Sequence, residues 1–125
     1  TIIAGSSMGG LISYYAMLQR PDIFGKAGIF SPAFWTAPAI KGLTDSLAEK
    51  TNGKFFFYMG GKERGTSIND MQDLQELLGE KSKGMIYSVI DPTGEHNEKA
   101  WRKWFPEFYK WMIADGYNTV IKTDN

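Results

Sequence analysis

Short apolar runs alternate along this chain with longer stretches in which hydrophobic residues recur every three or four positions. A short run of β-branched or aromatic residues, bounded by glycine, proline or serine, is typical of a buried strand. The sequence has such runs at Thr1–Ala4, Lys26–Ser31, Lys54–Met59 and Met85–Asp91. The third run is apolar from Phe55 to Met59, which predicts a strand buried on both faces.

Each of these runs is followed by a segment with helical spacing. Hydrophobic residues three or four positions apart give such a segment one apolar face, which packs against the rest of the domain. The predicted helices are Leu11–Arg20, Pro38–Lys50, Ser67–Gly79 and Glu98–Ala114, the last with a kink at Pro106. Strands that alternate with helices predict one α/β domain, a parallel sheet with crossover helices in a three-layer sandwich.

Three polar residues follow predicted strands at their carboxyl ends, where parallel sheets place their binding and catalytic sites. They are Ser7, Glu63 and His96. Because the carboxyl ends of parallel strands share one edge of the sheet, we expect these side chains to meet there.

Ser7 lies in Gly5-Ser6-Ser7-Met8-Gly9, which matches the Gly-x-Ser-x-Gly nucleophile elbow between a strand and a helix. Both glycines are expected to be needed, because a side chain at either would collide with the neighbouring strand or helix. The turn also places the backbone N–H of Met8 at a helix N-terminus, facing a developing oxyanion. The alternative is an ordinary strand-to-helix turn with Ser7 as the N-cap.

His96 is the only histidine in the sequence and therefore the one candidate base for Ser7. A surface histidine or a helix cap is the alternative. The imidazole needs a carboxylate, and Glu63 is favoured because it follows the Phe55–Met59 strand in a glycine-rich loop. Asp91 is the second candidate, and a solvated loop charge is the alternative role for Glu63.

Aromatic residues cluster in two further places. Phe34 and Trp35 lie in a loop after a strand and are candidates for lining a substrate pocket, with packing under the next helix as an equal alternative. The aromatic stripe from Trp101 to Trp111 is interpreted as core packing.

The composition of the chain excludes several kinds of binding site and cofactor. The 14 basic and 14 acidic residues balance, so no net field favours nucleic acid. The sequence has no cysteine, which excludes disulfides, a thiolate nucleophile and cysteine-ligated zinc. We see no metal-ligand spacing, no phosphate-binding loop and no other cofactor motif. No apolar run approaches the roughly 18 residues of a membrane span.

The combined motifs resemble the putative esterase (esterase D-like) family of α/β hydrolases, and most closely its branch of siderophore-type esterases and predicted hydrolases. The matching segments are Ala4–Leu11, Arg20–Gly25, Phe30–Trp35, Gly60–Glu63 and Gly94–Asn97 with Trp101. The resemblance implies a Ser7–Glu63–His96 triad and ester hydrolysis through an acyl-enzyme. It also implies that earlier strands, and the loop with the second oxyanion N–H, would precede Thr1.

The sequence therefore predicts a serine carboxylic-ester hydrolase that acts on a small-molecule ester. Residues 1–125 are expected to form the C-terminal part of a single α/β-hydrolase domain, because the chain opens on a strand with no initiator Met. Acyl transfer on the same fold and a non-catalytic binding module are the alternatives. The sequence is compatible with association with a second copy of the chain. It is also compatible with a cytoplasmic location and with a periplasmic or secreted one.

Overall fold

A parallel sheet forms the centre of the computed structural model, which describes residues 1–63, 65–114 and 120–123. Its strands lie side by side in chain order, and every neighbouring pair is parallel. They are β1 (Ile2–Ser6), β2 (Lys26–Phe30), β3 (Lys54–Gly60), β4 (Met85–Asp91) and β5 (Val120–Thr123). The sheet therefore has all its carboxyl ends at one edge, as the strand and helix alternation predicted.

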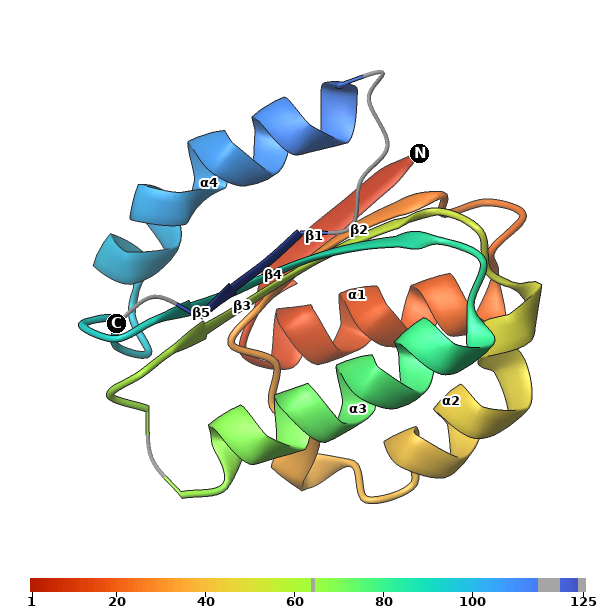
Figure 1. Cartoon of the computed structure of the whole chain (residues 1–125), viewed down its shortest axis with the longest axis horizontal. Helices are drawn as coiled ribbons and strands as arrows, with labels where there is room; N and C mark the ends of the chain where they lie inside the picture. Colours follow the sequence, from red (N-terminus) through yellow and green to blue (C-terminus); the bar gives the residue numbers. More distant parts are fainter. Residues whose placement is uncertain (64, 115–119, 124–125) are drawn as a thin grey trace.

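Helices cover both faces of this sheet (Figure 1). They are α1 (Met8–Gln19), α2 (Ile40–Leu47), α3 (Ser67–Lys81) and α4 (Glu98–Ile113). The first three lie together on one face and α4 lies alone on the other, which confirms the three-layer α/β architecture. Short 3₁₀ turns at Phe34–Thr36 and Ala48–Lys50 flank α2.

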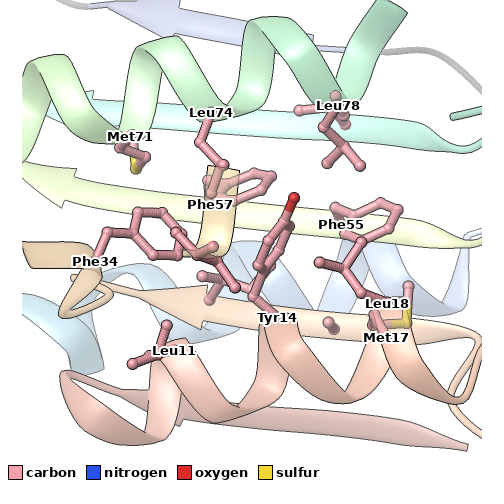
Figure 2. Close-up of a cluster of buried hydrophobic side chains, with 14 of the residues drawn as sticks. Leu11, Tyr14, Met17, Leu18, Phe34, Phe55, Phe57, Met71, Leu74 and Leu78 are labelled. Carbon is pink, nitrogen blue, oxygen red and sulfur yellow. The ribbon is translucent and has the colours of Figure 1, made fainter. Parts of the chain in front are cut away.

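The central strand β3 supplies side chains to both layers of the core. Phe55, Phe57 and Met59 pack on the side of α1 and α3, where Figure 2 shows the phenyl rings of Phe55 and Phe57 beside Tyr14. Phe56 and Tyr58, the alternate positions, pack on the side of α4. These five consecutive residues of β3 are completely buried, as expected for a strand covered on both faces.

Two elements differ from those that the hydrophobic pattern predicted. The expected helix over residues 38–50 is shorter: α2 begins at Ile40, ends at Leu47 and continues as the 3₁₀ turn. Strand β5 was not predicted, and it pairs with β4 from Tyr87 to Ile90. The last helix runs through Pro106 as a single element.

Candidate active site

Ser7 lies in a sharp turn between β1, which ends at Ser6, and α1, which begins at Met8. Its backbone φ of 57° and ψ of −117° fall outside the regions that side-chain-bearing residues favour. The Ser7 N–H donates to the Phe30 carbonyl at 2.9 Å, so the adjacent strand holds this turn in place. Met8, as the first helical residue, has an N–H without a partner inside the helix.

The glycines around Ser7 differ in how much space surrounds them. A Cβ on Gly5 would lie 2.5 Å from the carbonyl carbon and oxygen of Gly9, which confirms that Gly5 permits the close approach of strand and helix. The same expectation is wrong for Gly9, where an added Cβ meets nothing within 4 Å among the described residues. Gly10 is the helix glycine that permits close packing, since a Cβ added there would lie 2.8 Å from the Phe30 carbonyl oxygen.

His96 lies between the other two predicted residues, although all three come from different loops. Its Nε2 is 3.0 Å from the Ser7 hydroxyl, and its Nδ1 is 2.8 Å from the Glu63 Oε1. An ionised carboxylate only accepts hydrogen bonds, so this network assigns the ring proton to Nδ1 and leaves Nε2 as an acceptor. The arrangement allows the Ser7 hydroxyl to pass its proton to His96.

Glu63 is held firmly from the side opposite His96. Its side chain is only 3% exposed, so the structure rules out the alternative of a solvated loop charge. The second carboxylate oxygen, Oε2, accepts hydrogen bonds from the Gly60 N–H at 2.8 Å and the Ser31 hydroxyl at 2.5 Å. The Glu63 N–H returns to the Gly60 carbonyl at 3.1 Å, which closes a tight loop directly after β3.

Asp91, the second candidate for the acid, lies in a separate network. Its Oδ2 accepts from Lys103 Nζ and Trp104 Nε1, both at 2.9 Å, and its Oδ1 accepts from Thr93. Burial alone raises the pKa of Asp91, but the hydrogen bonds from these groups outweigh it and lower the pKa to about 2. Asp91 thus ties the end of β4 to α4, and Glu63 is the carboxylate that contacts His96.

The two aromatic residues proposed for the substrate pocket separate in the structure. Phe34 is buried against Tyr14, with their rings 5.6 Å apart, so the packing alternative describes it. Trp35 is 55% exposed, and the centroid of its ring lies 6.4 Å from the centroid of the His96 ring. A hollow of about 600 Å³ opens beside His96, and its walls include Trp35, Lys62, Thr66 and Glu95.

Two residues at the site were missed by the sequence analysis. Ser31 binds the carboxylate of Glu63, and Trp101, interpreted as core packing, donates its indole N–H to Ser31. The position of Ser31 directly after β2 was the available signal, because it places the residue at the same sheet edge as Ser7. Trp101 was named in the sequence analysis only as part of the family resemblance and of the aromatic stripe, and neither assigned it a role at the site.

The described part of the chain has neither a metal-ligand cluster nor a membrane-spanning helix. No group of three or more histidine, aspartate or glutamate side chains gathers there as a metal site. None of the helices in residues 1–63 and 65–114 is both long and apolar enough to cross a bilayer.

Comparisons with known proteins agree with this architecture. The uncharacterized protein YbbA of Bacillus subtilis (strain 168) is 26% identical over 129 residues, covering 93% of this chain and 50% of that protein. The acylaminoacyl peptidase of Pyrococcus horikoshii, an α/β hydrolase, superposes with a TM-score of 0.67 at 16% identity, covering 94% of this chain and 25% of the peptidase. The chain thus spans about half the length of the Bacillus relative and has the α/β-hydrolase fold.

The family comparison extends over most of the sequence. The model of the family described as putative esterase matches residues 1–112, from before β1 into the last turn of α4. The chain therefore belongs to the putative esterase family.

Proposed function

We propose that this chain carries the catalytic machinery of a serine carboxylic-ester hydrolase, with Ser7 as the nucleophile, His96 as the base and Glu63 as the acid. The observation that carries the proposal is the unbroken line of hydrogen bonds from the Ser7 hydroxyl through both nitrogens of His96 to Glu63, at 3.0 and 2.8 Å. Membership of an esterase family supports the same class of reaction.

In the acylation half, the Ser7 oxygen attacks the ester carbonyl while His96 Nε2 takes the hydroxyl proton. The carbonyl oxygen becomes an oxyanion, and the N–H of Met8 at the start of α1 is the donor proposed to stabilise it. The intermediate collapses, the bond to the alcohol oxygen breaks, and His96 returns the proton to the departing alcohol. Glu63 stabilises the imidazolium that exists between these transfers.

In the deacylation half, a water molecule replaces the alcohol. His96 removes one water proton as the oxygen attacks the acyl carbon, and then returns the proton to the Ser7 oxygen as the ester bond to Ser7 breaks. The products are a carboxylic acid and a regenerated serine. The hollow beside His96 supports this proposal, because it gives a small ester access to the imidazole, whose Nε2 is 3.0 Å from the Ser7 hydroxyl.

The experiment compares Ser7→Ala with Ser6→Ala in the natural full-length protein. We expect hydrolysis of a nitrophenyl acetate ester by the parent and by Ser6→Ala, and a loss of several orders of magnitude in kcat for Ser7→Ala. A fluorophosphonate probe should label the parent at Ser7, as located by peptide mass spectrometry. Equal activity of Ser7→Ala and the parent, or no labelling of the folded parent, would refute the proposal.

Acyl transfer and a binding role are separated by the same assays. Labelling of Ser7 with transfer of the acetyl group to an added alcohol, in place of release as acetate, would identify an acyltransferase. A folded protein that neither reacts with the probe nor cleaves esters would be a binding module on this fold.

A further inference from the structure

A partly buried line of hydrogen bonds continues from Glu63 on the side away from His96. The indole Nε1 of Trp101, on α4, donates to the Ser31 hydroxyl oxygen at 2.9 Å. The Ser31 hydroxyl donates in turn to Glu63 Oε2 at 2.5 Å. Residues from the end of β2, the loop after β3 and the first turns of α4 therefore meet behind the proposed acid.

The chemistry of the donors fixes the direction of every proton in this line. An indole N–H only donates, so the oxygen of Ser31 must accept from Trp101. The hydroxyl proton of Ser31 is then free to point only toward Glu63, whose ionised oxygens only accept. Together with the Gly60 N–H, it occupies Oε2 and leaves Oε1 to receive the Nδ1 proton of His96.

Ser31 is held in the conformation that this line needs. It is fully buried, and its φ of 45° lies in the left-handed region that disfavours residues with a side chain. Its N–H donates to the Tyr58 carbonyl at 2.8 Å, which anchors the backbone to β3. Strained residues that the surrounding structure holds in place are typical of functional sites.

Trp101 contacts the proposed base as well as Ser31. Its ring meets the His96 ring edge to face, with centroids 5.2 Å apart and an interplanar angle of 81°. The helix that carries Trp101 begins just after His96, and the Asn97 side chain caps it by accepting from the Ala100 N–H. One side chain thus limits the movement of both the base and the acid.

We propose that Ser31 and Trp101 are positioning residues that hold Glu63 and His96 in register for proton transfer. This inference rests on the proposed function of the site, because it assigns their effect to the Glu63–His96 pair. Without the Ser31 hydroxyl, one donor to Oε2 is lost and the carboxylate can rotate away from His96. Neither residue is proposed to contact the ester, so the effect belongs to the chemical step.

The test measures kcat and KM for Ser31→Ala and Trp101→Phe in the full-length protein, with active sites counted by fluorophosphonate titration. We expect kcat to fall about tenfold or more in Ser31→Ala, which loses a hydrogen bond to a charged group, and about threefold to tenfold in Trp101→Phe, which loses one to a neutral hydroxyl. KM should stay within about twofold, because substrate binding is untouched. The kcat of the double variant should lie only a little below that of the more impaired single variant, because both substitutions break the same line of hydrogen bonds.

Two further variants separate positioning from a general effect on stability. Ser31→Gly removes the hydroxyl but suits the positive φ, so it should fold at least as stably as Ser31→Ala and lose as much kcat. Ser88→Ala removes another buried serine hydroxyl, which donates to Gln75 at 2.7 Å on the far side of the sheet from α4, and should keep the parent kcat.

The proposal is overturned if Ser31→Gly or Trp101→Phe keeps the parent kcat, if KM rises while kcat stays constant, or if Ser88→Ala loses as much kcat as Ser31→Ala. With any of these results, an inactive Ser7→Ala variant would show that the proposed function still holds. An active Ser7→Ala variant would instead show that the proposed function itself has failed.

Discussion

Ser7, the proposed nucleophile, has a backbone conformation that a residue with a Cβ rarely adopts. The turn at φ 57° lifts the side chain toward His96, while hydrogen bonding to Phe30 keeps the backbone from relaxing. The proposed function thus depends on a local geometry that lowers the stability of the fold. The strain at this position can be measured by comparing two variants of Ser7 that differ only in the presence of a Cβ.

We expect Ser7→Gly to be more stable than Ser7→Ala. Both variants lose the hydroxyl and its hydrogen bond to His96, but only glycine tolerates this φ without strain. The difference in the free energy of unfolding should be about 1 kcal/mol, after the entropy cost of a glycine is deducted. Urea unfolding of the two proteins measures it, and a more stable Ser7→Ala would show that the turn carries no strain.

At this scale the sequence identified residues by their position after strands. Ser7, Glu63 and His96, which the structure brings together, were predicted to meet because strand ends, a glycine-bounded serine and a single histidine can be recognised in the sequence. Ser31 and Trp101 were not, since their part depends on a positive φ and on one indole N–H within an aromatic stripe. Hydrophobic patterning records burial and leaves such hydrogen bonds unmarked.

Among the elements, β1 and α1 approach so closely that their contact depends on one missing side chain. Gly5 on the strand faces the backbone of Gly9 on the helix, and backbone atoms cannot move aside as a flexible side chain would. The position of Ser7 follows from this contact, because the serine lies between the two elements.

We expect Gly5→Ala to destabilise the protein by about 3 kcal/mol and to reduce esterase activity, because the added Cβ must push α1 away from β1. Gly9→Ala is the matched control: its Cβ has open space, and alanine favours the helix by about 1 kcal/mol. Thermal unfolding and ester hydrolysis of both variants check the prediction. Equal losses in the two would show that the elbow needs both glycines.

The periodicity of the sequence predicted most elements because strands and helices here carry long apolar patterns. The parallel direction of four strands, with helices as crossovers, followed from the alternation of strands and helices along the chain. Strand β5 has only four residues, and its Val120 and Ile121 gave too short a run to distinguish a strand from a loop. The C-terminal end of α2 was missed because the 3₁₀ turn Ala48–Lys50 continues directly from the helix.

Across the whole molecule, Asp91 connects the sheet to the layer formed by α4. It lies at the end of β4, is 5% exposed, and accepts hydrogen bonds from two side chains of the helix, those of Lys103 and Trp104. Its folded pKa of about 2 lies below its ordinary 3.8. Its charge therefore stabilises the fold above about pH 4, and that contribution is lost as the pH falls toward 2.

We expect Asp91→Asn to lower the free energy of unfolding at pH 7 by about 2 kcal/mol, because the hydrogen bonds lose their charged acceptor. The gap between parent and variant should narrow at pH 3, where the parent carboxylate begins to take up its proton in the unfolded chain. Urea titrations at both pH values measure it. Asp22→Asn, at an exposed pair with Arg20, should change stability little, and an equal gap at pH 7 and pH 3 would contradict the prediction.

The hydrogen bond between Ser7 and His96 joins positions 89 residues apart in the chain. Such a distant pairing closes a long loop, and the entropy cost of that closure is recovered only after the intervening strands have paired. During synthesis Ser7 leaves the ribosome well before His96, so their hydrogen bond cannot form in a nascent polypeptide that still lacks residue 96. The proposed base therefore reaches the proposed nucleophile only after most of the sheet has been synthesised and paired.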